Sequence, residues 1–251
     1  MNRELNNKFS WKTATFMAKL SYHAYDGLDE FKKVFKEDWD IKFLDWGGTE
    51  CFILSCPKNY IVSFRGTQAT SWEDIKADIN VHKSKREYQP NNSGTGSVGK
   101  VHSGFRHALN DVWDNLLEDY KKNAQGKQLL VTGHSLGAAL ATLYTDRIND
   151  PKSVCYTFGS PRVGNKDLIS NMNFTCYRFR NNNDIVTRVP FEWLGFTHKS
   201  TELKYFNVDG IVRHGFDRWY LFFQWVKGTY RTLMRDKTWD AFADHSMGEY
   251  Y

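Results

Sequence analysis

The sequence has few of the residues that mark small disulfide-rich or zinc-binding proteins. Only 4 of its 251 residues are cysteine, and none of them stands in a Cys-x-x-Cys pair. This spacing supports neither a disulfide framework nor a metal site. Each cysteine lies in an apolar, strand-like stretch, so we expect four buried free thiols at Cys51, Cys56, Cys155 and Cys176.

Long apolar runs are also missing. None approaches the roughly 18 residues that a membrane-spanning helix needs. The first residues, MNRELNNKFSWKTATF, contain no apolar core of a secretory signal. We therefore expect no cleavable signal peptide and no transmembrane helix. The expected location is cytoplasmic, or outside the cell after export by a signal-less route.

Neither sign of charge dominates. The 34 Lys and Arg residues exceed the 29 Asp and Glu residues by only five, and they are spread along the chain. Without a dense basic stripe, no nucleic acid is expected as a partner. What the sequence has in quantity is hydrophobic residues, at 41%, and aromatic residues, at 16%. These are enough for a sizeable core and an apolar binding face.

Hydrophobic periodicity predicts alternating strands and helices, the pattern of a parallel sheet with crossover helices. A hairpin is expected around Gly47 and Gly48, and a loop over 89–99. The predicted helices span 10–25, 71–79, 103–123, 135–148, 165–171 and 213–243. The predicted strands span 41–46, 51–55, 59–64, 128–132, 153–158, 174–179 and 203–208.

One short motif stands where this alternation makes it informative. The stretch QLLVTGHSLGAALATLY, residues 128–144, places Ser135 between a predicted strand and a predicted helix. Gly-x-Ser-x-Gly is weak as a bare pattern, but strand, tight turn and helix form the setting of a nucleophile elbow. Gly133 and Gly137 would remove Cβ clashes, and the N–H of Leu136 could hold an oxyanion. The alternative is that Ser135 only caps the helix.

A serine nucleophile needs a base, an orienting acid and oxyanion donors. In folds with this elbow, the acid and then the histidine follow the serine along the chain. Three histidines follow Ser135, namely His198, His214 and His245. His134 flanks the serine and helps to shape the turn, but it lies on the wrong side to act as the base.

Six stretches, the serine motif among them, make the chain resemble the fungal-type (class 3) lipases, a triacylglycerol lipase family with the α/β-hydrolase fold. They occur in order between residues 60 and 251, and residues before them match only loosely. The stretches are IVSFRGT (61–67), KVHSGF (100–105), VTGHSLGAALA (131–141), YTFGSPRVGN (156–165), NNDIVTRVP (182–190) and ADHSMGEYY (243–251).

The resemblance implies a fold and a triad. The fold would be one α/β-hydrolase domain over 1–251, with a central, mostly parallel sheet flanked by helices and a helical insertion at 211–243 before the catalytic histidine. Ser135 would be the nucleophile, Asp184 the acid and His245 the base. Asp184 could instead be a turn residue, with Asp209 as the alternative acid. His198 and His214 are the weaker candidates for the base.

The resemblance also implies supporting residues. Thr67 would supply an oxyanion N–H and hydroxyl, together with the N–H of Leu136. Asp78 lies where the family keeps an aspartate that holds this hydroxyl, although it could equally lie on a solvated helix face. His134, Gly133 and Gly137 would support the turn. Arg65 is expected to form a structural ion pair.

Lipid contact is expected from aromatic residues around the site. The stretch 68–78 is short and polar for a lid, with Trp72 its one exposed-looking aromatic residue. The helical stretch 213–235 carries Trp219, Phe222 and Phe223 among basic residues. Such a helix could contact an anionic membrane surface or cap an acyl pocket, or it could simply pack on the core.

Together these features predict a serine carboxylester hydrolase that acts on lipid esters, namely triacylglycerol, mono- or diacylglycerol, or phospholipid. It would need neither a cofactor nor a metal. Its partner would be the lipid ester, together with peripheral membrane contact, and the sequence does not identify a protein partner. The alternatives are a phospholipase A, a short-chain or feruloyl-type esterase, and an inactive hydrolase fold that serves as a binding module.

Overall fold

The central feature of the fold is an eight-stranded sheet in the order β1-β2-β3-β6-β7-β9-β11-β12. The computed structural model describes Leu5 and residues 8–66, 87–88, 99–207, 211–213 and 245–247. Strands β3, β6, β7, β9 and β11 run parallel to one another, and β1, β2 and β12 pair antiparallel at the two edges. The sheet strands are β1 Asp40–Trp46, β2 Thr49–Ser55, β3 Asn59–Phe64, β6 Gln128–His134, β7 Val154–Phe158, β9 Thr175–Asn181, β11 Glu202–Phe206 and β12 Val212–Arg213.

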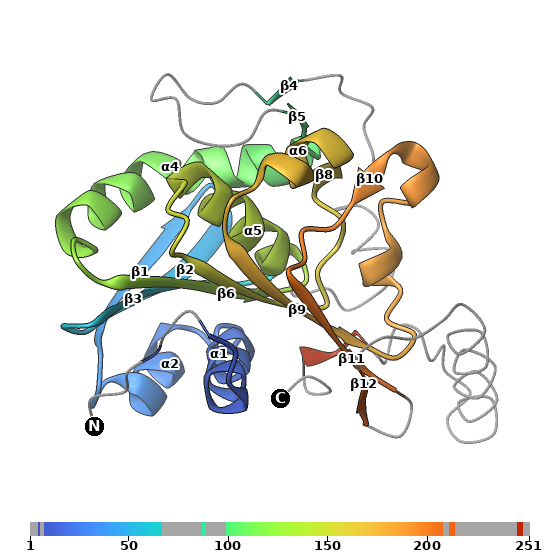
Figure 1. Ribbon diagram of the computed structural model, residues 1–251. Helices are drawn as coiled ribbons and strands as arrows, with labels where there is room; N and C mark the ends of the chain where they lie inside the picture. The colour runs from blue at the N-terminus through green and yellow to red at the C-terminus, as the bar shows by residue number, and fades with distance from the viewer. Residues whose placement is uncertain are drawn as a thin grey trace.

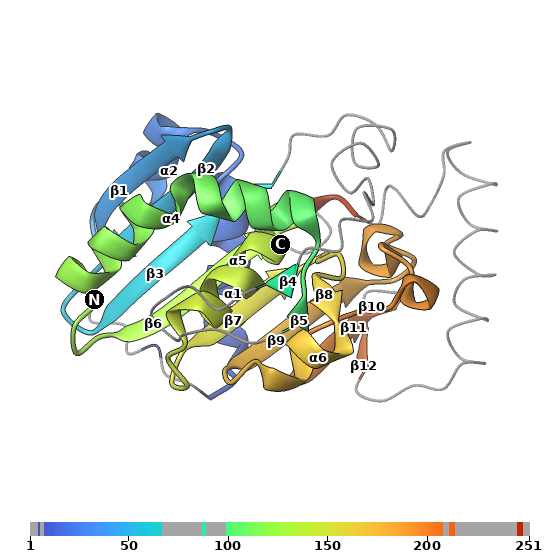
Figure 2. The same cartoon turned by 90° about the horizontal axis from the view of Figure 1, so that it is seen from above.

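Helices cover both faces of this sheet. Figure 1 shows α4, α5 and α6 on one face and α1 and α2 on the other. In the view from above, α4 lies over the side of the sheet that holds β1, β2 and β3, and α5 lies over the parallel strands β6 and β7 (Figure 2). Each face has its own hydrophobic cluster, one under α4 and α5 and one under α1 and α2. The helices are α1 Trp11–His23, α2 Leu28–Phe35, α4 Ser103–Asn123, α5 Leu136–Ile148 and α6 Lys166–Asn171.

Short elements lie beyond the carboxyl ends of the parallel strands. Two small antiparallel pairs join β4 to β5 and β8 to β10, and two 3₁₀ turns follow β9. Their bounds are β4 Glu87–Tyr88, β5 Gly99–Lys100, β8 Gly164–Asn165, η1 Val186–Arg188, η2 Glu192–Leu194 and β10 Phe196–Thr197. Among the described residues, no helix is both long and apolar enough to cross a bilayer.

Most predicted elements are confirmed. The hairpin turns at Gly47 and Gly48, both with positive φ, and it joins β1 to β2. All six residues of β3 are buried, as expected for a strand covered on both faces. The central, mostly parallel sheet flanked by helices is therefore confirmed. The helix predicted over 71–79, the loop residues 89–98 and almost all of the insertion at 211–243 lie outside the described residues.

Three details of the sequence prediction were wrong. Helix α2 was missed because it has only eight residues and its N-cap residue, Gly27, provides no side-chain cap. Strand β6 continues two residues beyond the predicted end, as far as His134. None of the cysteines forms a disulfide, and Cys51, Cys155 and Cys176 are buried as predicted. Cys56 is only half-buried, because it lies just after the end of β2.

Candidate active site

The candidate site lies where the parallel strands end. Ser135 stands between β6 and α5, Gly159 follows β7, and Asp184 follows β9. Because the carboxyl ends of parallel strands meet at one edge of a sheet, these three segments converge. Their convergence at this edge makes it the natural place for a reaction site.

Ser135 adopts a strained backbone conformation. Its φ is 56° and its ψ is −126°, a region that non-glycine residues rarely adopt. The two flanking glycines allow the turn. A Cβ on Gly133 would lie 2.4 Å from the carbonyl of Gly137, and one on Gly137 would lie 2.4 Å from the carbonyl oxygen of Phe64. The turn is held further by the Ser135 N–H, which donates to the Phe158 carbonyl at 3.0 Å.

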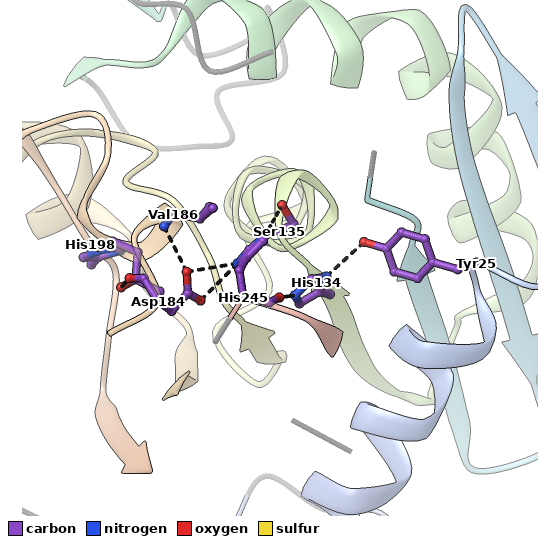
Figure 3. Close-up of polar contacts among 8 residues, drawn as sticks. Tyr25, His134, Ser135, Asp184, Val186, His198 and His245 are labelled. Atoms are coloured by element: carbon purple, nitrogen blue, oxygen red, sulfur yellow. Dashed lines mark hydrogen bonds and ion pairs between the residues drawn. The ribbon is translucent and has the colours of Figure 1, made fainter. Parts of the chain in front are cut away.

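Ser135, His245 and Asp184 lie together in a hydrogen-bonded row (Figure 3). The Nε2 atom of His245 is 2.8 Å from the Ser135 hydroxyl oxygen. Its Nδ1 atom lies 3.0 Å and 3.1 Å from the two carboxylate oxygens of Asp184. Because a carboxylate only accepts, Nδ1 carries the proton and Nε2 is left to accept the serine hydroxyl proton. All three side chains are buried.

The loop that carries Asp184 is fixed by its own hydrogen bonds. The Val186 N–H donates to the Asp184 carboxylate at 2.9 Å, and the Thr187 hydroxyl donates to the Asp184 carbonyl at 2.7 Å. His198 contacts the same loop, because its Nε2 lies 2.8 Å from the Thr187 carbonyl oxygen. The alternative base is thus placed in the segment that supports the acid, with the Arg178 guanidinium 3.1 Å from the same nitrogen.

Gly159 is a site residue that the sequence analysis missed. Its φ is +58°, and an added Cβ would lie 2.9 Å from an Asp184 carboxylate oxygen and 3.0 Å from the ring of His245. Any side chain here would separate the acid from the histidine. The signal was present in YTFGSPRVGN, because a glycine directly after a buried strand can mark a close backbone approach.

The remaining predicted residues divide into two groups. Leu136 is the first residue of α5, where backbone N–H groups have no acceptor within the helix, and Arg65 forms an ion pair with Glu50 as expected. The others lie outside the described residues: Thr67, Trp72, Asp78, Asp209, His214, Trp219, Phe222 and Phe223. Within residues 8–66 and 99–207 and the shorter described segments, no group of three or more His, Cys, Asp or Glu residues could hold a metal ion.

His134, which is buried, and His198, which is half-buried, are both held neutral. Burial lowers the pKa of His134 well below its usual value, and the neighbouring His245 lowers it further. Burial also lowers the pKa of His198, with the Arg178 charge as the second cause. Both imidazoles therefore serve as neutral hydrogen-bonding groups rather than charges.

These two shifts make stability depend on pH. The unfolded chain binds protons near pH 6.5 that the folded chain does not bind, so the free energy of unfolding falls as the pH drops below that value. Each histidine contributes a slope of up to about 1.4 kcal/mol per pH unit. We expect urea unfolding at pH 7 and pH 5 to show this loss. His198→Gln should flatten the dependence, whereas substitution of the exposed His107 should not; equal stability at both pH values would contradict the assignment.

Comparison with known proteins identifies relatives of the region that carries the site. The family model described as lipase (class 3) matches residues 61–193. A chloroplastic phospholipase A(1) of Arabidopsis thaliana is 32% identical over 154 residues, which are 53% of this chain and 34% of the relative. A secreted mono- and diacylglycerol lipase of Malassezia globosa is 30% identical over 178 residues, or 64% of this chain and 55% of the relative.

Solved structures show the same fold. Lipase II from Rhizopus niveus superposes with a TM-score of 0.65 at 21% sequence identity, covering 93% of this chain and 92% of that one. A lipase–propeptide complex of Rhizomucor miehei gives a TM-score of 0.62 at 23% identity, over 80% of this chain and 68% of that one. The chain spans less than half the length of the first curated relatives, at 34%, 45% and 35%.

The comparisons also correct the expected location. The relatives from Penicillium and Malassezia are named secreted lipases, which points to export. The expectation of a cytoplasmic protein, or of one exported by a signal-less route, is therefore wrong. That expectation rested on the missing apolar core in the first residues, and the residues that build the sheet and the site carry no information about the compartment.

Proposed function

This chain belongs to the class 3 lipase family, and from that premise we propose that it is a serine carboxylester hydrolase acting on lipid esters. The observation that carries the proposal is the hydrogen-bonded row from Ser135 through His245 to Asp184. Its members occur in the chain order serine, acid, histidine, and they meet at the carboxyl edge of the sheet. The strained backbone at Ser135 adds weight, because such strain persists mainly at functional sites.

The proposed reaction follows from the positions of the protons. His245 Nε2 takes the hydroxyl proton as Ser135 Oγ attacks the ester carbonyl, and the resulting imidazolium is stabilised by Asp184. His245 then returns that proton to the leaving alcohol, which leaves an acyl group on Ser135. A water molecule, deprotonated by His245 in the same way, attacks the acyl carbonyl. The bond to Ser135 Oγ then breaks, His245 returns the proton to Oγ, and the carboxylic acid leaves.

Oxyanion stabilisation would come from the amino end of α5 and from the segment after β3. The N–H of Leu136, the first residue of α5, directly follows the nucleophile and is proposed as the first donor. Thr67, next to Gly66, is proposed as the second donor, and Asp78 as the residue that holds its hydroxyl. Each such donor contributes roughly 100- to 1000-fold to kcat in hydrolases of this chemistry.

An inactive binding module is the main rival from another class. It would require no working proton path, yet the serine, histidine and carboxylate lie at hydrogen-bonding distances with Asp184 fixed by Val186 and Thr187. These contacts favour an enzyme. The names of the relatives, which cover phospholipase A(1) and mono- and diacylglycerol lipases, support lipid esters as the substrate class but do not select one head group.

Contact with a lipid surface is part of the proposal. Phe191 and Trp193 are 47% and 79% exposed, and their rings stack with centroids 6.0 Å apart. They belong to the segment that follows the Asp184 loop, so they lie at the same end of the sheet as the site. Exposed aromatic side chains of this kind favour the interface between water and lipid.

The acyl-chain preference tests the substrate class. We expect hydrolysis of p-nitrophenyl esters to rise from two towards sixteen carbons, because a lipid enzyme gains apolar contact with each added methylene. Cosedimentation with anionic vesicles in the same preparation tests the surface contact. The matched pair is Trp193→Ser against Trp46→Ser, since Trp46 is 63% exposed on the edge strand β1.

Both the hydrolysis assay and the vesicle-binding assay have a result that would contradict the proposal. Activity confined to short chains would retain the mechanism but exclude lipid esters as the preferred substrate. Protein that stays in solution with vesicles, or equal binding by both tryptophan variants, would overturn the role of Phe191 and Trp193. Absence of hydrolysis for every ester, glyceride and phospholipid would favour the binding module.

A further inference from the structure

His134, the residue before the nucleophile, contacts the histidine of the row through its backbone. Its Nε2 atom is 2.8 Å from the His245 carbonyl oxygen, and the two rings stack with centroids 4.6 Å apart. On its other side, His134 Nδ1 lies 2.9 Å from the hydroxyl of Tyr25 (Figure 3). Tyr25 therefore connects through one imidazole to the segment that carries His245, although 109 residues separate Tyr25 from His134 in the chain.

The partners fix where the protons lie. A carbonyl oxygen only accepts, so His134 Nε2 must carry a proton and donate it to the His245 carbonyl. Burial lowers the pKa of His134, so the ring is neutral and its Nδ1 accepts. Burial also raises the pKa of Tyr25, so its hydroxyl keeps its proton and donates it to Nδ1. Each nitrogen of the His134 ring thus has one defined role, Nε2 as a donor and Nδ1 as an acceptor.

Helix α1 and strand β6 hold Tyr25 in place. The Ser21 hydroxyl lies 2.9 Å from the Thr132 hydroxyl, and Tyr25 meets His134. Ser21 belongs to the last turn of α1, and Tyr25 lies in the turn that follows the helix end at His23, where its N–H donates to the Tyr22 carbonyl at 3.2 Å. The Ser21–Thr132 contact therefore sets the position along β6 at which the Tyr25 hydroxyl reaches His134.

Tyr25 also contacts the segment that enters the proposed oxyanion residue. The Gly66 N–H donates to the Tyr25 hydroxyl oxygen. The approach is so close that a Cβ on Gly66 would lie 2.2 Å from that oxygen and 2.6 Å from the His134 carbonyl oxygen. Gly66 directly precedes Thr67. The hydroxyl therefore lies between the end of β3 and the end of β6, in contact with both.

We propose that Tyr25 and His134 are positioning residues that fix the backbone of the catalytic histidine relative to the oxyanion segment. This inference rests on the proposed function. Neither residue touches the reacting atoms; they act through His245 and Gly66. A neutral His134 suits the role, because a charged ring stacked on His245 would repel the imidazolium that forms during the reaction. Loss of the hydrogen bonds from Tyr25 to His134 and from His134 to His245 would misplace the base and the oxyanion donor together.

Tyr25→Phe tests the positioning role because it removes only the hydroxyl oxygen that contacts His134 and Gly66. We expect kcat for p-nitrophenyl butyrate to fall by about 10- to 100-fold, since small misplacements of catalytic groups have effects of this size. KM should change by less than about twofold, because no substrate contact is lost. Tyr22→Phe is the matched control. Tyr22 belongs to α1 and is 38% exposed, and its variant should keep the wild-type kcat.

Two variants of His134 separate hydrogen bonding from simple packing. His134→Gln retains an amide that can donate to the His245 carbonyl, whereas His134→Leu fills similar space without a donor. We expect the glutamine variant to recover most of the kcat that the leucine variant loses. Adding Tyr25→Phe to His134→Leu should cause little further loss, because residues of one network are not additive.

The outcomes distinguish this inference from the proposed function. If Tyr25→Phe and His134→Leu keep the wild-type kcat while hydrolysis still depends on Ser135, the positioning role is overturned and the proposed function stands. Equal losses in the glutamine and leucine variants, in proportion to lost folded protein, would reduce His134 to a packing residue and also overturn it. A wild-type protein without Ser135-dependent hydrolysis would overturn both proposals.

Discussion

Ser135→Ala is expected to lower kcat for ester hydrolysis by about 10⁴-fold or more, because the nucleophile has no substitute in the site. The nearest other groups are His245, which remains as a base without a serine to activate, and the N–H of Leu136, which can still polarise a carbonyl. The small residual rate would come from substrate binding and oxyanion contacts alone. The measurement is hydrolysis of p-nitrophenyl esters by purified wild type and variant.

A second variant at this position separates chemistry from folding. Alanine keeps the strain of a φ of 56°, whereas Ser135→Gly removes both the hydroxyl and the strain. We expect the glycine variant to be as inactive as the alanine variant and more stable by about 1 kcal/mol. Ser55→Ala, at the opposite end of the sheet, should leave activity unchanged. Residual activity near the wild-type level in Ser135→Ala would remove Ser135 as the nucleophile.

The sequence was sufficient to predict Ser135 as a candidate because strand, turn and helix surround it within seventeen residues. The burial and periodicity of 128–132, 135–148 and 153–158 are local properties, and local properties determined these elements correctly. The candidates Asp184 and His245 depended on chain order and on resemblance, since periodicity alone left His198 and Asp209 open. The structure places His198, the residue directly after β10, against the Thr187 carbonyl.

Contacts between distant segments could not be predicted in this way. Tyr25 and His134 are 109 residues apart, and nothing local to Tyr25 indicates that α1 lies against β6. The role of Gly159 depends on how closely Asp184 and His245 approach its Cα, which is set by the packing of β7 beside β9. Such residues are determined by the register of whole elements, and register emerges only when the sheet and its helices are assembled.

Asp184→Asn is expected to lower kcat by about 10⁴-fold while leaving the fold intact. The Val186 N–H donates to the Asp184 Oδ1 atom at 2.9 Å, so it would orient the amide oxygen of asparagine towards that side. The amide nitrogen would then occupy the place of the second oxygen, which lies 3.1 Å from His245 Nδ1. A nitrogen that donates there favours the tautomer with Nδ1 unprotonated.

In that tautomer His245 Nε2 carries the proton and cannot accept the one from Ser135, so the loss should appear in kcat rather than in KM. Asp119→Asn is the matched control, because Asp119 is also a buried carboxylate, bound to Lys42 at 2.7 Å and Tyr60 at 2.8 Å. We expect Asp119→Asn to lower the free energy of unfolding and to leave kcat unchanged. If Asp184→Asn kept the wild-type kcat, His245 would not depend on this carboxylate, and the acid would have to be sought elsewhere in the chain. A large kcat loss in Asp184→Asn with none in Asp119→Asn would assign the effect to the tautomer of His245 rather than to the removal of a buried charge.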